Sequence, residues 1–344
     1  MSSLSCGIVG LPNAGKSTLF NALASRRLAE TAPRPFTTIE PHEAVVAIPD
    51  KWLDKLHEVV SGQLSTPRES LRQAQGKLTT PGVSKLPDKV PATVTFIDIA
   101  GLVRGAHKGE GLGNQFLGKI REVDAIVHVV RAFIDPGITH QHPTHEPGSI
   151  KQVLEDIETI NIELELGGIE KKPIIYVLNV DENNLVNIDY LAEVEKKYKE
   201  KAMLISAKME EELIDFSDKE REDYLKEVGV DKTGLERLII QAYSLLDLIS
   251  FYTIKPSSAK ASEGHGTGRI ISAWSLPAGR QVLDAAERVH TDFAKNFIKA
   301  EVINVEELLN LGSWVKAKER GKIRLEGKDY TVQDRDVIEF KVNT

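Results

Sequence analysis

A glycine-rich stretch near the N-terminus constrains this chain more than any other part of it. Residues 10–18 read GLPNAGKST and fill the pattern G-x-x-x-x-G-K-[ST]. The apolar run Cys6–Val9 precedes them, and Leu19, Phe20 and Leu23 follow at helical spacing. A strand, a tight turn and a helix N-terminus in this order surround one phosphate with backbone N–H groups. The sequence therefore predicts a P-loop, which is a binding site for a nucleoside triphosphate.

The P-loop supplies candidates for both phosphate and metal contacts. Lys16 is expected to reach the β- and γ-phosphates and to neutralise their charge, and Ser17 is expected to ligate Mg²⁺ through its hydroxyl. Gly10 and Gly15 permit backbone torsions that a Cβ would obstruct. The loop residues predicted to contact the nucleotide are Asn13, Ala14, Gly15, Lys16, Ser17 and Thr18.

Composition narrows the class of protein further. The 344 residues allow two domains, and 28% charged with 41% hydrophobic residues is typical of a soluble globular protein. No apolar run approaches bilayer length, and Cys6 is the single cysteine, so we expect a cytoplasmic protein with no membrane partner. The net charge of −7 argues against a globally basic nucleic-acid binder. We expect a monomer with no DNA partner.

Apolar runs alternate with polar or glycine-rich turns up to about residue 249. Between several of them lie helical patterns, of which Ser149–Leu166 is the clearest and Leu235–Ile249 is the last. Strands that alternate with helices predict a mostly parallel sheet in an α/β domain over residues 1–249. The expected strands are Cys6–Val9, Ala44–Ile48, Thr93–Ile97, Ala125–Val130, Pro173–Leu178 and Ala202–Ile205.

The pattern changes after residue 249, which predicts a small α+β domain over residues 250–344. We expect a helix at Gln281–Val289 and a hairpin over Ile323–Val332 that turns at Glu326–Lys328. The expected strands are Ile270–Trp274, Glu301–Ile303 and Val337–Val342. Two polar segments, Ser61–Lys89 and Ser257–Gly268, are predicted to be long surface loops.

Further motifs follow the predicted strands. Asp98 begins the sequence D-I-A-G, where an aspartate can hold Mg²⁺ through water and Gly101 can donate its N–H to the γ-phosphate. Thr38 lies between the P-loop helix and the next strand, and its hydroxyl can complete the Mg²⁺ shell. Asn179–Glu182 and Ser206–Lys208 occupy the places of the two base-reading loops of guanine-nucleotide switches.

These motifs resemble the YchF group of Obg-related P-loop NTPases, which carry a C-terminal TGS domain of the ubiquitin-like β-grasp type. The matching segments are Gly10–Thr18, Thr37–Pro41, Asp98–Ala106, Gly109–Asn114, Asn179–Glu182, Ser206–Glu212, His290–Phe293 and Glu326–Tyr330. The resemblance implies slow hydrolysis of ATP to ADP and phosphate, with the ribosome or ribosomal RNA as the partner. The family's helical arm is expected to be missing, because Gly167–Glu170 leads almost directly into a strand.

The residues of the base-reading motif favour ATP over GTP. Guanine readers use N-K-x-D, whose aspartate accepts two hydrogen bonds from guanine, but here Val180 replaces the lysine and Glu182 replaces the aspartate. The Asn179 amide can still meet the adenine N6/N7 edge. ATP is therefore the expected substrate, with GTP as the alternative. The predicted base contacts are Asn179, Val180, Glu182, Ser206, Ala207 and Lys208.

The residue after Gly101 is Leu102, where many GTPases have a water-orienting glutamine. Leucine has no polar group, so another group must position the attacking water. By resemblance His140 matches a histidine of the family's mobile loop, and His107 is the alternative. The predicted catalytic residues are His140, Gly101 and Lys16.

Two other functions remain open from the sequence: a metabolic P-loop kinase, and a non-enzymatic adaptor in which nucleotide is only structural. For either a switch or an adaptor, residues 316–324 form the densest positive cluster of the C-terminal domain and are the expected RNA contact. A solvated helix end is the alternative interpretation of that cluster.

Overall fold

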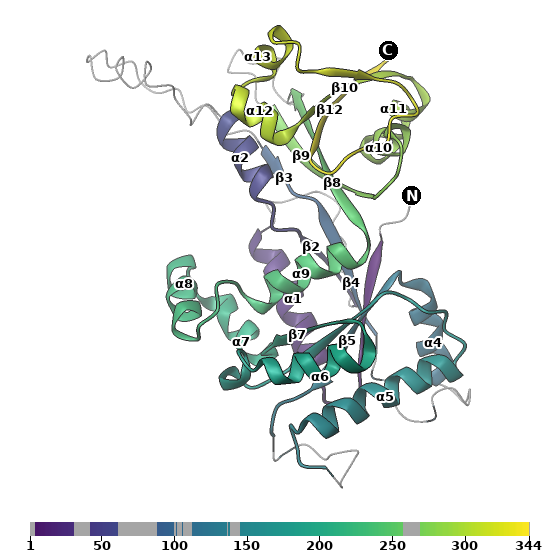
Figure 1. The fold of residues 1–344 in the computed structure, drawn as a ribbon, viewed down its shortest axis with the longest axis vertical. Helices are drawn as coiled ribbons and strands as arrows, with labels where there is room; N and C mark the ends of the chain where they lie inside the picture. Colours follow the sequence, from purple (N-terminus) through teal and green to yellow (C-terminus); the bar gives the residue numbers. More distant parts are fainter. Residues whose placement is uncertain are drawn as a thin grey trace, which may run out of the picture. The chain divides into compact units, whose positions relative to one another are not determined.

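The computed structural model describes residues 4–30, 42–60, 88–99, 101, 105, 112–135, 137, 145–256 and 269–343. The chain forms two compact units (Figure 1). The P-loop unit comprises residues 2–48 and 94–246, and the C-terminal unit comprises residues 49–93 and 247–344. This division differs from the predicted boundary at residue 249, because the described residues 49–60 and 88–93 pack with the C-terminal unit. Their strand pairs within its sheet, and Tyr252 donates its hydroxyl proton to Asp50 Oδ2 at 2.8 Å.

The P-loop unit is built on a six-stranded sheet in the order β2-β4-β1-β5-β6-β7. Its strands are β1 (Ser5–Val9), β2 (Glu43–Ala47), β4 (Thr93–Asp98), β5 (Ala125–Arg131), β6 (Ile174–Asn179) and β7 (Lys201–Ile205). The pairs β1–β4, β1–β5, β5–β6 and β6–β7 are parallel. The predicted mostly parallel α/β sheet is confirmed, and the carboxyl ends of β1, β4, β5, β6 and β7 lie on one edge, where such folds bind ligands.

Helices pack against this sheet. They are α1 (Lys16–Glu30), α4 (Leu112–Glu122), α5 (Ile150–Leu166), α6 (Ile188–Tyr198), α7 (Ala207–Glu212), α8 (Asp218–Glu227) and α9 (Gly234–Leu245), with 3₁₀ turns at Glu182–Asn184 and Leu213–Asp215. Helix α5 begins after Ser149, as predicted, because the Ser149 hydroxyl accepts a hydrogen bond from Gln152 N at 3.3 Å. Its fully buried residues Val153, Ile157 and Ile160 contribute to the core.

Two features of this unit bear on the predictions. Helix α9 ends at Leu245 rather than at Ile249, because Asp247 adopts a φ of 49° and Ile249 already belongs to the next strand. Residues 167–173 alone connect α5 to β6, so the helical arm is missing at this point, as predicted.

The C-terminal unit has a mixed six-stranded sheet in the order β11-β10-β12-β8-β9-β3. The strands are β3 (Asp88–Val90), β8 (Leu248–Pro256), β9 (Arg269–Pro277), β10 (Phe297–Asn304), β11 (Arg324–Glu326) and β12 (Asp336–Val342). The helices are α2 (Lys51–Val60), α10 (Val282–Val289), α11 (Thr291–Lys295), α12 (Val305–Leu311) and α13 (Trp314–Glu319). Strands β8 and β12 are parallel, and α10 packs its buried face on this sheet.

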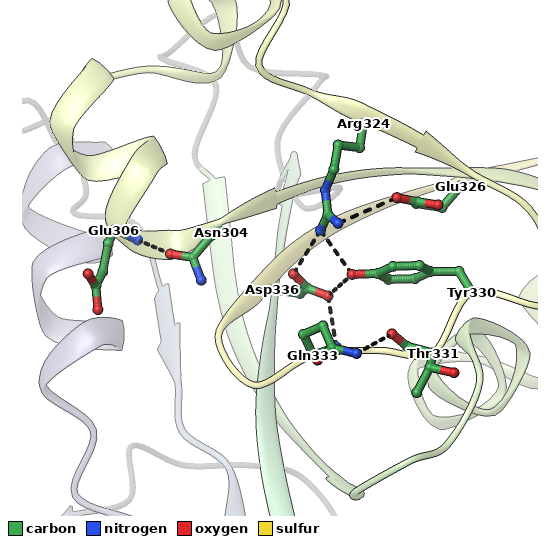
Figure 2. Close-up of polar contacts among 8 residues, drawn as sticks. All are labelled: Asn304, Glu306, Arg324, Glu326, Tyr330, Thr331, Gln333 and Asp336. Carbon is green, nitrogen blue, oxygen red and sulfur yellow. Dashed lines mark hydrogen bonds and ion pairs between the residues drawn. The ribbon is translucent and has the colours of Figure 1, made fainter.

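Two expectations for this unit are wrong. Asp88 and Lys89 were expected at the end of a loop but belong to β3, which pairs in parallel with β9. The remaining parts of the two expected loops lie outside the described residues. The segment 323–332 is not a hairpin, because β11 pairs with β10 instead. Tyr330 and Arg324 turn toward Asp336 (Figure 2), and Tyr330 donates its hydroxyl proton to Asp336 Oδ2 at 2.6 Å.

No helix within the described ranges is long and apolar enough to cross a membrane.

Candidate nucleotide-binding site

The P-loop connects β1 to α1, and its two glycines are required by close contacts. A Cβ on Gly10 would lie 2.2 Å from the Val129 carbonyl oxygen. Gly15 has a φ of 92°, and a Cβ there would lie 2.2 Å from Asn179 Nδ2. Both approaches are shorter than a van der Waals contact, so larger residues would displace either the loop or the strands beneath it. The loop is therefore packed directly on β5 and on the end of β6.

Lys16 is the first residue of α1, and its side chain is only 8% exposed. Its ammonium donates a hydrogen bond to the Leu11 carbonyl at 2.8 Å. Burial lowers the pKa of Lys16 to about 8, and the nearby Asp98 carboxylate opposes that shift. A Cβ on Gly101 would lie 3.1 Å from Lys16 Nζ. The structure thus brings together three predicted residues that are far apart in sequence.

Mg²⁺ prefers oxygen ligands, and in nucleotide sites it commonly binds one or two carboxylates together with substrate phosphates. The Asp98 carboxylate lies at the end of β4, beside Lys16, and the exposed Ser17 hydroxyl lies in the first turn of α1. In the described part of the chain, no group of three His, Cys, Asp or Glu side chains forms a metal cage of its own. These donors fit a Mg²⁺ ion that shares its coordination shell with the nucleotide.

Asn179 was predicted to face the base, which stays a prediction, and the structure gives its amide two partners within the protein. Asn179 Nδ2 donates to the Ala14 carbonyl at 3.1 Å, and Asn179 Oδ1 accepts from Ala207 N at 2.9 Å. The side chain is buried. It therefore ties the P-loop to the start of α7, and one donor hydrogen and one acceptor site of the amide remain beyond these two bonds.

The remaining base-loop residues differ in what they can offer a ligand. The Val180 side chain is buried in the core of the unit, so only its backbone is available. Ser206 is the N-cap of α7, and its hydroxyl accepts from Met209 N at 3.4 Å. Ala207 is buried, while the Lys208 side chain is 82% exposed with its ammonium 3.9 Å from Glu212 Oε1. Lys208 is the one side chain of this second loop that is free to move toward a base.

Glu182 opens the 3₁₀ turn after β6, and its carboxylate has a partner that the sequence did not reveal. Tyr224 of α8 donates its hydroxyl proton to Glu182 Oε2 at 2.9 Å. Burial and the neighbouring Glu182 carboxylate raise the pKa of Tyr224 to about 12, so the phenol stays protonated and remains a donor. No sequence motif marks Tyr224, because it lies in a helix of charged residues.

The loop after β5 is held at both ends. Ile134 N donates to Asp181 Oδ2 at 3.2 Å, which joins the start of this loop to the base-reading motif. Near its other end, Gly148 N donates to Gln152 Oε1 at 2.9 Å, and Tyr190 donates its hydroxyl proton to the Gly148 carbonyl. His140, the predicted water-positioning residue, belongs to this loop but lies outside the described residues.

Thr38, predicted to complete the Mg²⁺ shell, also lies outside the described residues, as do Leu102 and His107. The roles of Thr38 and His140 therefore stay predictions. Asn13 and Ser17 are exposed at the loop, while Ala14 is buried beneath it and Thr18 is partly buried.

Comparison with known proteins places this site in a family. Residues 5–180 match the family model described as "50S ribosome-binding GTPase", and residues 248–343 match the YchF-GTPase_C model, described as a protein of unknown function. The Bacillus subtilis protein named ribosome-binding ATPase YchF is 35% identical, and the alignment covers 99% of this chain and 100% of that protein. The chain belongs to the YchF family.

Other YchF proteins agree with this placement. The Haemophilus influenzae protein, also named ribosome-binding ATPase YchF, is 37% identical over 98% of this chain and 99% of its own length. The solved structure titled Schizosaccharomyces pombe YchF GTPase aligns with a TM-score of 0.73 and 26% identity, covering 99% of this chain and 98% of that one.

Family membership confirms the predicted α/β P-loop NTPase fold with a C-terminal domain and the predicted class of enzyme, a P-loop nucleotide hydrolase. The assignment of the C-terminal domain as a TGS domain stays a prediction. It also favours the switch over the metabolic kinase that the sequence left open. The names of these relatives differ in the nucleotide, since the bacterial proteins are called ATPases and the yeast structure is called a GTPase. The choice of base therefore has to be argued from the residues of this chain.

Proposed function

We propose that this YchF-family protein is a switch that binds ATP with Mg²⁺, hydrolyses it slowly and associates with the ribosome. The observation that carries the proposal is the convergence of Asp98 and Gly101 on the buried ammonium of Lys16 at the P-loop. In switch NTPases, contacts of this kind sense the γ-phosphate, and loop conformation changes when it leaves. The names of the bacterial relatives support both the ATPase activity and the ribosomal partner.

The preference for ATP rests on Glu182. The Asn179 amide is already engaged with Ala14 and Ala207, and the Val180 side chain is buried, so the Glu182 carboxylate is the main acceptor left in the first base loop. A glutamate is one methylene longer than the aspartate of guanine readers, which misplaces its oxygens for the paired donors of guanine. In nucleic-acid readout, one well-placed bidentate contact separates bases by roughly 1–3 kcal/mol.

We expect ATP to bind at least about tenfold more tightly than GTP, which corresponds to the lower half of that range. Parallel calorimetric titration of the full chain with non-hydrolysable ATP and GTP analogues in Mg²⁺ measures the ratio. Tighter binding of the GTP analogue would overturn the nucleotide assignment. Phosphate release from ATP, measured with and without ribosomes, separates the switch from the non-enzymatic adaptor, which would release none.

The ribosomal contact is proposed for the basic cluster of the C-terminal unit. We assign it to those cations of the cluster that form no ion pair within the described part of the chain. Within the basic cluster of residues 316–324, Lys318 Nζ lies 3.6 Å from Glu301 Oε1 and Lys322 Nζ lies 3.0 Å from Glu307 Oε1. Arg324 is bound to Tyr330 and Asp336 (Figure 2). Lys316 and Arg320 are exposed and have no ion pair among the described residues. They are the two cations of the cluster that are available to RNA phosphates.

Reversal of both charges in a Lys316→Glu/Arg320→Glu variant is expected to weaken ribosome co-sedimentation about tenfold or more and to lower its salt dependence by roughly two phosphate contacts. ATP hydrolysis without ribosomes should not change. The matched control is Lys295→Glu/Lys299→Glu, which makes the same charge change at two exposed lysines of the same unit. Equal losses in both variants would show that only net charge matters.

A further inference from the structure

Tyr224 links two segments that flank the predicted base site. Glu182 follows β6 and belongs to the first base loop, whereas Tyr224 lies on α8, downstream of the second base loop and α7. The 2.9 Å hydrogen bond from the Tyr224 hydroxyl to Glu182 Oε2 joins them. Both side chains are partly buried. The choice of base depends on the Glu182 carboxylate, and the hydrogen bond from Tyr224 is the contact that the structure shows for it.

The tyrosine ring is held in place by its own surroundings. Its edge-to-face contact with Phe216 has a centroid distance of 5.7 Å and an interplanar angle of 78°. Helix α8 is anchored to the preceding turn, because Arg221 Nη2 donates to the Phe216 carbonyl at 3.3 Å and the Leu213 carbonyl at 3.4 Å. Ser217 and Glu220 form a capping box at the start of the same helix. Tyr224 is thus a pre-positioned donor on a rigid element.

The consequence for the base follows from the direction in which each carboxylate oxygen points, since an ionised carboxylate has about four acceptor sites and one hydrogen bond does not use them up. A guanine reader must turn both carboxylate oxygens toward the base, because guanine presents two adjacent N–H donors. Adenine presents only the N6 amine, which one oxygen can accept. A phenol that holds Glu182 Oε2 directs that oxygen toward α8 and leaves Oε1 for the base. This arrangement satisfies adenine and leaves one guanine donor without an acceptor, which is the costly outcome for a buried polar group.

We propose that Tyr224 is a specificity-determining positioning residue, which selects adenine over guanine by fixing the Glu182 carboxylate. This inference rests on the proposed ATP preference and deepens it. Tyr224 itself need not touch the nucleotide. Tyr224 affects the choice of base only by orienting Glu182 Oε2. Its effect on base preference should therefore disappear when residue 182 has no carboxylate.

The test is Tyr224→Phe, which removes the hydroxyl and keeps the ring against Phe216. We expect the ratio of GTP to ATP affinity, measured with non-hydrolysable analogues on the full chain, to rise about 5- to 20-fold. This is the range expected when one polar contact that separates two bases is altered. The control is Tyr198→Phe in the same unit, which removes a tyrosine hydroxyl that shares its proton between the Leu154 carbonyl at 2.9 Å and Glu158 Oε2 at 3.2 Å. The control should leave the ratio unchanged.

A double-mutant cycle separates positioning from a merely structural role. In the Glu182→Ala background, Tyr224→Phe is expected to leave the GTP to ATP ratio unchanged, since no carboxylate remains to be oriented. An unchanged ratio in the single Tyr224→Phe variant, or an equal change with and without Glu182, would overturn the inference. The wild-type titration is read separately: preferred binding of GTP by the wild type would overturn the proposed ATP preference, whatever the variants do.

Discussion

Replacement of Lys16 by alanine is expected to abolish nucleotide hydrolysis and to weaken ATP binding by about 100- to 1,000-fold. The ammonium is largely buried against the P-loop, where solvent screens it less than at the surface, so its attraction to a triphosphate is strong. Truncation of one partner of a buried, hydrogen-bonded charge pair typically costs about 2–5 kcal/mol. Isothermal titration with ATP and single-turnover phosphate release measure the two effects.

The same variant should not be less stable than the wild type. Burial lowers the pKa of Lys16 in the folded protein below its ordinary value, so at neutral pH the folded state binds this proton less favourably than the unfolded chain does. Removal of the side chain therefore removes an unfavourable contribution to folding. Lys226→Ala, on the exposed face of α8, is the control for loss of a lysine. ATP binding that survives Lys16→Ala within a factor of three would contradict the assignment.

The P-loop, the parallel sheet and the D-I-A-G motif were predictable because each is a local pattern. A strand, a glycine turn and a helix are specified by neighbouring residues, and Ser149 caps α5 through a bond to Gln152, three residues away. The convergence of Asp98 on Lys16 also followed from sequence, because the ends of adjacent parallel strands meet at one edge.

The errors concern residues whose partners are distant in sequence. Asp88 and Lys89 end a segment that reads as a polar loop, and only the pairing with β9 makes them part of a strand. The segment 323–332 has a turn sequence, yet β11 pairs with β10 and Tyr330 binds Asp336 (Figure 2). Strand propensity depends on what lies beside the strand, so such local patterns cannot decide its partner.

In the predicted base site, too, the sequence could not predict contacts between side chains that are distant along the chain. The motifs Asn179–Glu182 and Ser206–Lys208 predicted the two base loops, but they could not reveal that the Asn179 amide binds Ala14 and Ala207 or that Tyr224 binds Glu182. These contacts join segments between 28 and 165 residues apart, and no periodicity encodes them. The contacts that Asn179 and Glu182 make within the protein were therefore visible only in the structure.

Asn179→Ala is expected to lower the free energy of unfolding by about 2–5 kcal/mol and to weaken ATP binding at least about tenfold. The substitution leaves the Ala14 carbonyl and the Ala207 N–H without partners in a buried place, and each unsatisfied group costs about 1–3 kcal/mol. The P-loop also loses its connection to α7, so ATP must order the loop as it binds. Urea denaturation and calorimetric titration measure the two losses.

Two further variants decide what the amide does. Asn179→Asp keeps an oxygen for Ala207 N but turns a second oxygen toward the Ala14 carbonyl, which Asn179 Nδ2 approaches to 3.1 Å. Two acceptors at that separation repel each other, so the aspartate should be nearly as harmful as the alanine. Asn183→Ala, at an exposed position of the neighbouring 3₁₀ turn, should leave stability and affinity unchanged. If Asn179→Asp kept wild-type stability while losing only ATP affinity, Asn179 would be a base reader after all, because a positioning amide must affect the fold and the ligand together.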